Sequence, residues 1–125
     1  MRLKAQNLTN MSEHPAIAWK VLTAPQMSEL LEQGVFAGAP VDLADGYIHL
    51  STVHQLGETI DKHFTGQQDL HLAKVDLVAL GDAIRWEPSR GGALFPHIYA
   101  PLPLNAVLAH GPLVRLDEGG IDLPG

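Results

Sequence analysis

The sequence predicts an α+β fold of mainly antiparallel, split β-sheets with two short helices. At 125 residues, with 46% hydrophobic and 18% charged residues, the chain is long enough for one hydrophobic core and too short for two. Two segments have apolar residues at helical spacing, and the strand-like segments of the second half follow one another without a helix between them. Strands in close succession favour antiparallel pairing, which is typical of α+β folds.

The first strand and the first helix have the clearest signals. Ala16–Leu22 alternates, with three large apolar residues on one side and Lys20 on the other, and this pattern predicts a strand. Thr23 is suited to cap a helix that has an early proline, Pro25, and closes at Gly34.

The next segment is expected to contain little regular structure. Val35–Pro40 is apolar and small, and we expect an irregular crossing rather than a strand. Asp42–Gly46 is predicted to be a turn, because Asp-Gly supplies local backbone hydrogen bonding and a permissive φ. Tyr47–Leu50 is then expected to form a short strand.

A second helix and four strands complete the expected domain. Ser51 or Thr52 can cap a helix that has apolar residues at helical spacing and stops near Gly66. Pro88–Gly92 is predicted to be the turn between the second and the third of the four strands that follow this helix. Gly111–Pro112 interrupts the fourth strand. The four strands are predicted at Leu70–Val75, Ile84–Glu87, Leu94–Tyr99 and Val107–Leu116.

The two ends of the chain are expected to lie outside the packed domain, which we place at residues 14–117. Residues 1–13 contain two basic side chains but no apolar stretch of the kind that a secretion signal needs, and they are predicted to be a disordered leader. Residues 118–125 contain a pair of glycines and a proline and are predicted to be a loose tail.

Composition narrows the class of function. The absence of cysteine excludes disulfides and thiolate metal sites and suits a cytoplasmic protein. No apolar run approaches the ~20 residues that span a bilayer, so no membrane partner is expected. A net charge of −6 argues against long nucleic acids as ligands. Between Arg85 and Arg115, however, there are three arginines and one acid, a pattern that suits a focused site for a small anion.

The first candidate site surrounds His49. Strand alternation places His49 opposite the apolar residues of its strand and therefore at a surface or a cleft. The helix that starts after Ser51 and Thr52 has backbone N–H groups that attract anions, so these three residues could contact a phosphate or a ribose. The alternative is that Ser51 and Thr52 only cap the helix while His49 bonds a backbone carbonyl.

The second candidate site is the strand and turn that contain Arg85, Glu87 and Arg90. Alternation places Arg85 and Glu87 on one face, where a neighbouring arginine would keep the glutamate ionised. The turn after them has glycines from which an anion-binding backbone nest can be built, although it matches no nucleotide-binding fingerprint. A hairpin turn with a structural ion pair is an equally good interpretation.

The third candidate site is the row Phe95, His97 and Tyr99, which alternation places on one face. Two aromatic rings beside an imidazole could stack on a base or a nicotinamide ring, and core packing is the alternative. A metal site is not expected, because the seven histidines include no pair at i, i+4 on a predicted helix and no thiolate is present. A Ser–His–Asp triad has no nucleophile-elbow sequence to support it.

Two sequence blocks indicate a family. Asp42–Thr52 (DLADGYIHLST) and Arg85–Tyr99 (RWEPSRGGALFPHIY) resemble domain-of-unknown-function family 952, and the likeness covers nearly all of Ile17–Val107. This bacterial family is grouped with the ADP-ribosyltransferase-like fold, in which a split pair of small sheets holds NAD in a cleft. The resemblance therefore implies an NAD-binding cleft.

The resemblance also implies roles for individual residues. His49 matches the strand histidine that contacts the NAD ribose in that fold, Tyr99 or Phe95 could pack on nicotinamide, and Glu87 could be the carboxylate near the scissile bond. The sequence His-Leu-Ser, followed later by Lys74–Asp76, also looks like the RNA 2′-phosphotransferase branch of the fold. That branch holds phosphate with a basic tetrad, which Arg85, Arg90, His49 and His97 could supply here.

We therefore expect a domain that binds NAD or a related nucleotide, with cleavage of the nicotinamide–ribose bond as a candidate reaction. The expected catalytic residues are Glu87 and His49, and the expected cofactor contacts are His49, Ser51, Thr52, Arg85, Arg90, His97 and Tyr99. A non-catalytic module that binds an anionic metabolite is the rival hypothesis, and an NAD-dependent RNA 2′-phosphotransferase is a third.

Overall fold

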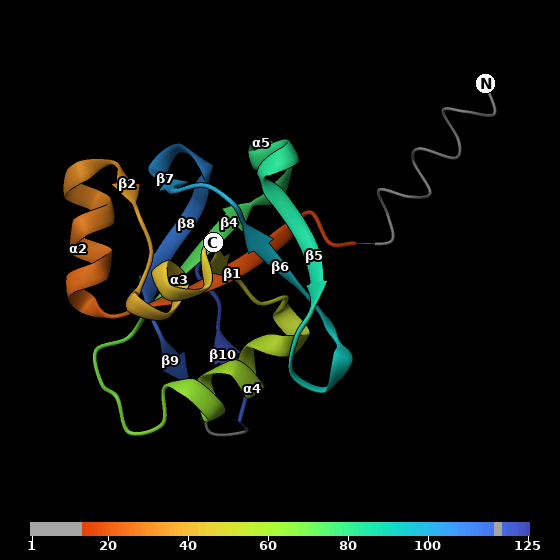
Figure 1. Ribbon diagram of the computed structural model, residues 1–125. Helices are drawn as coiled ribbons and strands as arrows, with labels where there is room; N and C mark the ends of the chain where they lie inside the picture. Colours follow the sequence, from red (N-terminus) through yellow and green to blue (C-terminus); the bar gives the residue numbers. More distant parts are fainter. Residues whose placement is uncertain (1–13, 117–118) are drawn as a thin grey trace.

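Two three-stranded antiparallel sheets form the frame of the computed structural model, which describes residues 14–116 and 119–125 (Figure 1). The first sheet has the order β1-β4-β8, and the second has the order β3-β6-β5. A bridge between Trp19 and Ser51 joins the two sheets, with each backbone N–H donating to the carbonyl oxygen of the other residue. The strands of the first sheet are β1 (Ile17–Leu22), β4 (His71–Asp76) and β8 (Val107–Pro112), and those of the second are β3 (Ile48–His49), β5 (Ile84–Pro88) and β6 (Leu94–Ile98).

Two further pairs of short strands flank this frame. Val35–Phe36 forms β2, which pairs with β7 at Leu102–Pro103, so the expectation of an irregular crossing at Val35–Pro40 is wrong for these two residues. Phe36 is buried there, which explains why the chain gains from fixing this segment against another strand. In the segment expected to be a loose tail, Ile121–Asp122 form β10 and pair with β9 (Val114–Arg115). The predicted leader, residues 1–13, lies outside the described residues.

The two predicted helices are present. Helix α2 (Ala24–Gln33) begins after Thr23, whose hydroxyl accepts a hydrogen bond from the Gln26 backbone N–H while the Gln26 side chain accepts one from the Thr23 N–H. This reciprocal capping satisfies two backbone donors that the helix itself leaves unpaired. Helix α4 (Val53–His63) begins after Thr52. None of the helices in the part of the chain that the structure describes is long and apolar enough to cross a membrane.

Two short α-helices were not anticipated. Pro40–Asp45 forms α3, so the prediction of a simple turn at Asp42–Gly46 is wrong; Gly46 caps this helix at a φ of 89°. The proline at its first position and the aspartate in its first turn both favour a helix start. Leu77–Leu80 forms α5, a single turn capped by the Asp76 side chain. The fold is nevertheless α+β with mainly antiparallel sheets and a few short helices, as predicted.

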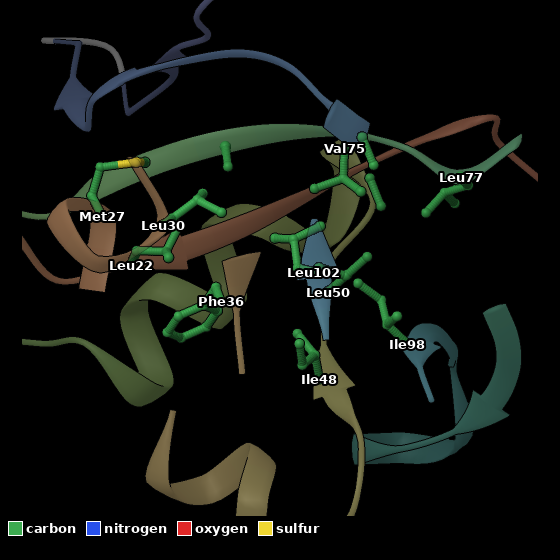
Figure 2. Packing of buried hydrophobic residues seen from close by; sticks show 13 residues of the cluster. Leu22, Met27, Leu30, Phe36, Ile48, Leu50, Val75, Leu77, Ile98 and Leu102 are labelled. Atoms are coloured by element: carbon green, nitrogen blue, oxygen red, sulfur yellow. The ribbon is translucent and has the colours of Figure 1, made fainter. Parts of the chain in front are cut away.

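Strand β1 is covered on both of its faces, which divides the core into two clusters. On one side, Leu22 belongs to a cluster of buried side chains from β1, α2, β3, β4 and β6 that includes Leu30, Ile48 and Ile98 (Figure 2). On the other side, Trp19 and its neighbours pack against α4. Lys20, which lies opposite the large apolar residues of its strand, is also buried, at 5% exposure. A buried ammonium group needs a partner, and this partner lies in the candidate site.

Candidate functional site

The register of the second sheet brings three of the predicted site residues into one row. His49 on β3 lies opposite His97 on β6, and Arg85 on β5 lies opposite His97 from the other side. Glu87 lies opposite Phe95 in the next row of the same face. Because side chains alternate between faces, this face bears the polar and aromatic residues while Ile48, Ile84 and Ile98 occupy the other.

The His49 ring is held between two carboxylates. Its Nδ1 lies 2.6 Å from Asp42 Oδ1, and its Nε2 lies 2.9 Å from Asp45 Oδ2. A carboxylate oxygen can only accept, so a ring nitrogen hydrogen-bonds to either aspartate as a donor. The imidazole is about one third exposed. It is therefore fixed in orientation yet still open to a ligand.

Asp42 is a buried hub that joins three elements. Its carboxylate accepts hydrogen bonds from Lys20 Nζ on β1 (2.9 Å to Oδ2), from the Ala39 backbone N–H (2.8 Å) and from the His49 backbone N–H (3.1 Å). Burial by itself would raise the pKa of this carboxyl, but the His49 ring, the Lys20 charge and the Ala39 N–H together lower the pKa to about 2. Asp42 is therefore ionised at neutral pH.

Lys20 completes this network. Besides Asp42, Nζ donates to the backbone carbonyl of His49 at 3.1 Å. Burial lowers the pKa of Lys20 below its ordinary value, and the Asp42 carboxylate opposes that change. The ammonium group thus ties β1 to Asp42 and to the backbone of His49, and its charge is largely neutralised by Asp42.

Glu87, His97 and Tyr99 form a second network on the same face. His97 Nδ1 lies 2.7 Å from Glu87 Oε1, and the Tyr99 hydroxyl donates to the same oxygen at 2.8 Å. These two hydrogen bonds lower the pKa of Glu87 below its ordinary value. The bond to Glu87 in turn raises the pKa of the Tyr99 hydroxyl. His97 is only 2% exposed, whereas the Glu87 side chain is about one third exposed.

Tyr47, which the sequence did not single out, packs between these networks. Its ring stacks on His97 at a centroid distance of 4.1 Å and contacts His49 and Tyr99 at 4.7 and 5.2 Å. Burial, with smaller effects from Asp45 and Glu87, raises the pKa of its hydroxyl. The guanidinium of Arg85 lies over the Tyr99 ring, with Cζ 4.6 Å from the ring centroid.

A pocket of about 570 Å³ opens beside His49 and His97, within the usual size range of small-molecule sites. Its walls come from β1, α2, α3, β3, α4 and β6 and include aromatic rings at Trp19, Phe64 and Phe95. Of the predicted site residues with described side chains, His49, Ser51 and His97 line it. The pocket wall does not include Arg85, Glu87, Thr52 or Tyr99. Glu87 instead contacts His97, and Tyr99 contacts Glu87.

Ser51 and Thr52 have local structural partners. The Ser51 hydroxyl lies 2.7 Å from the Thr59 hydroxyl on α4, and the Thr52 backbone N–H donates to the Gln55 side chain at 3.0 Å. Gln55 then donates to the Leu94 carbonyl oxygen at 2.7 Å, which ties the start of α4 to β6. Ser51 combines such a role with a place in the pocket wall, whereas Thr52 serves the helix start.

The turn after β5 reaches the pocket through Ser89. Residues Arg90–Gly92 form one short 3₁₀ turn, with φ of 68° at Gly91 and 84° at Gly92. These left-handed conformations favour glycine, in agreement with the predicted turn. The side chain of Arg90 lies outside the described part of the structure.

Sequence reasoning missed Asp42, Asp45 and Tyr47 as parts of the site. Asp45 precedes His49 by four residues, but a turn was expected between them, and only α3 places its carboxylate beside the ring. Lys20 could have signalled a buried partner, because it stands in the middle of an otherwise apolar strand. No group of histidine and carboxylate side chains suited to a metal ion occurs among the described residues.

The comparisons with known proteins identify the family. A model described as "Protein of unknown function (DUF952)" matches residues 21–110. The crystal structure of protein CC0527 from Caulobacter crescentus is 42% identical, with 86% of this chain and 94% of that chain covered and a TM-score of 0.77. Its solution NMR structure gives 41% identity, coverage of 86% and 91%, and a TM-score of 0.73. No curated protein matches the chain. By the extent of the family match, this chain belongs to the DUF952 family.

Proposed function

We propose that the pocket beside His49 and His97 binds NAD or a related nucleotide, as an ADP-ribosyltransferase-like domain would. The observation that carries this proposal is that two imidazoles on adjacent strands, with ring centroids 5.4 Å apart, line the same pocket of about 570 Å³. Imidazole nitrogens can hydrogen-bond ribose hydroxyls and phosphates in either protonation state. The size of the pocket suits a small organic ligand.

The pocket wall suits the aromatic part of a nucleotide. Trp19, Phe64 and Phe95 provide apolar and aromatic surface, on which a base or a nicotinamide ring can pack. Ser51 and Gln26 add polar groups that could fix its orientation. This combination of apolar walls with few polar groups is typical of cofactor sites.

The phosphates of such a ligand would lie toward Ser89 and the turn that follows it. Ser89 lines the pocket, and the left-handed glycines next to it allow the backbone to curve around an anion. Arg90 stays a predicted phosphate contact from the sequence. Arg85 is less suited to this role, since its guanidinium lies over Tyr99 and outside the pocket wall. This position also weakens the case for the basic tetrad of an RNA 2′-phosphotransferase.

Cleavage of the nicotinamide–ribose bond is the finer part of the proposal. A carboxylate near the ribose would stabilise the positive charge that develops when nicotinamide leaves. Glu87 is ionised, but it reaches the pocket only through His97, and Asp45 is the described carboxylate that lines the pocket. The rival hypothesis, a non-catalytic module for an anionic metabolite, is favoured by this separation of Glu87 from the pocket.

Calorimetry with NAD, ADP-ribose and nicotinamide mononucleotide tests binding, and release of nicotinamide from NAD tests cleavage. We expect binding heat with wild type and a clear loss of affinity in Arg90→Ala. If Glu87 supports cleavage, Glu87→Gln binds NAD with similar affinity but releases nicotinamide more slowly. Binding without release in any variant favours the non-catalytic module. If no variant gives binding heat and none releases nicotinamide, the nucleotide proposal is wrong.

A further inference from the structure

Among the described residues, only one of the two ring nitrogens of His97 has a hydrogen-bond partner. Nδ1 lies 2.7 Å from Glu87, and no described residue forms a hydrogen bond with Nε2. The side chain is 2% exposed, so bulk water has little access to that nitrogen. A buried polar atom without a partner costs free energy, and such atoms in native proteins are usually kept for a ligand or a bound water.

His97 belongs to the wall of the pocket in which the proposed ligand would lie. His97 lines the pocket, whereas Glu87, toward which Nδ1 points, does not. The ring plane is covered by Tyr47, which stacks on it at 4.1 Å and 24°. Glu87 contacts Nδ1 and Tyr47 covers one face of the ring, so Nε2 is the polar ring atom that remains for a ligand in this pocket.

The tautomer of the neutral His97 ring follows from its hydrogen-bond partner. Glu87 is ionised at neutral pH, because hydrogen bonds from His97 and Tyr99 lower its pKa. An ionised carboxylate only accepts hydrogen bonds, so Nδ1 must carry a proton in order to bond it. In the neutral imidazole the other nitrogen, Nε2, is then a bare acceptor.

We propose that His97 Nε2 is a hydrogen-bond acceptor that selects a ligand hydroxyl or amide N–H, and that Glu87 and Tyr99 are positioning residues that hold this tautomer. The inference rests on the proposed function and makes it more specific: a ribose hydroxyl, rather than a phosphate oxygen, contacts His97. A phosphate has only acceptor oxygens when fully ionised, so it would leave a bare Nε2 unsatisfied.

His49 differs from His97 in its hydrogen bonding, and the two rings together favour one kind of ligand group. Both of its nitrogens contact carboxylates, so it presents N–H donors, whereas His97 presents an acceptor. A hydroxyl can donate to His97 and accept from His49 after displacing Asp45, and the two rings lie 5.4 Å apart between centroids. A pair of neighbouring ribose hydroxyls suits a donor and an acceptor at this spacing.

Long-range proton–nitrogen NMR spectra of the imidazoles test the proposal in the free protein. His97→Gln identifies the His97 signals by their absence. We expect Nδ1 to be protonated and Nε2 bare in wild type, and a shift toward the other tautomer in Glu87→Gln. Glu58→Gln, which removes the same charge from an exposed position on α4, should leave the His97 signals unchanged. A protonated Nε2 in wild type, or an unchanged tautomer in Glu87→Gln, would overturn the assignment.

The same signals are then followed during titration with NAD, D-ribose and inorganic sulfate, which like the phosphates of NAD has only acceptor oxygens. We expect NAD and ribose to move the Nε2 resonance as it accepts a hydrogen bond, with the nitrogen remaining unprotonated, and sulfate to leave it unchanged. Protonation of Nε2 on addition of sulfate would contradict the inference, as would calorimetric binding of NAD without movement of Nε2. Absence of any binding heat with NAD would instead remove the proposed function, while the tautomer in the free protein is still read independently.

Discussion

Asp42 and His49 are joined twice, because the His49 backbone N–H and ring Nδ1 both contact Asp42 Oδ1, at 3.1 and 2.6 Å. Two contacts from one residue to one oxygen fix both the strand position and the ring orientation of the histidine. Since Lys20 holds the same carboxylate from β1, the site histidine is positioned by a charge network that crosses from one sheet to the other.

The first prediction concerns the stability that this hub provides. Asp42→Asn should destabilise the fold by ~3 kcal/mol, because it leaves the buried Lys20 ammonium without its counter-charge. Lys20→Met should lower the free energy of unfolding by less, because methionine can occupy the space of the lysine side chain. Asp42 keeps its other hydrogen-bond donors in this variant. Urea unfolding of both single variants and the double variant measures the coupling. A coupling below about 0.5 kcal/mol would mean that the pair contributes no more than a surface ion pair does.

The second prediction concerns the loss of stability at low pH. The folded-state pKa of Asp42, about 2, lies below the ordinary value of 3.8, so its ionised form stabilises the fold above pH ~4. This contribution, about 2 kcal/mol, is lost as the pH falls from ~4 toward ~2. A titration of the Asp42 carboxyl carbon by NMR should give a midpoint near 2. A midpoint at or above 3.8 would show that burial outweighs the hydrogen bonds.

The sequence predicted those parts of the site that depend on local pattern. Alternation along the strands placed His49, Arg85, Glu87 and His97 on one face, and the observed register agrees with this. The cap at Thr23 and the close at Gly34 were also predictable, because both depend on residues within one or two turns of the helix end.

The rest depends on contacts between distant segments. The burial of Lys20 was not predicted, since alternation shows which side chains share a face but not what covers that face. Asp42 buries its carboxylate because Lys20, 22 residues earlier, neutralises it. Helix α3 resembles a turn in sequence because it is short, and its aspartates contact Lys20 and His49 only once β1 and β3 lie beside it.

The third prediction compares two glycines. Gly46 ends α3 at a φ of 89°, and a Cβ there would meet nothing within 4 Å, so Gly46→Ala tests backbone strain alone. We expect a loss of ~1 kcal/mol, the cost of a left-handed conformation for alanine. Gly57 lies within α4, also with open space around a Cβ, and Gly57→Ala should stabilise by roughly 0.5–1 kcal/mol. Thermal unfolding distinguishes them, and equal changes of the same sign would contradict the assigned conformations.

The fourth prediction separates the two carboxylates that hold His49. Asp45 is about 45% exposed and lines the pocket, whereas Asp42 is buried. Asp45→Asn should therefore change stability by less than ~0.5 kcal/mol, as exposed ion pairs contribute little. It should also strengthen NAD binding roughly two- to fivefold, because it removes a negative charge from the pocket wall and leaves His49 Nε2 free to donate to the ligand.

Glu58→Gln is the matched control for that experiment, since it makes the same change in net charge at an exposed position outside the pocket wall. If its NAD affinity also rises, the effect is one of overall charge, and Asp45 has no special place. If Asp45→Asn instead weakens binding, the carboxylate serves the ligand directly, for example by accepting from a ribose hydroxyl. A gain of NAD affinity in Asp45→Asn that is absent from Glu58→Gln supports an anionic ligand that displaces Asp45 from His49. Of these two variants, only Asp45→Asn both removes a negative charge and leaves His49 Nε2 without its carboxylate partner.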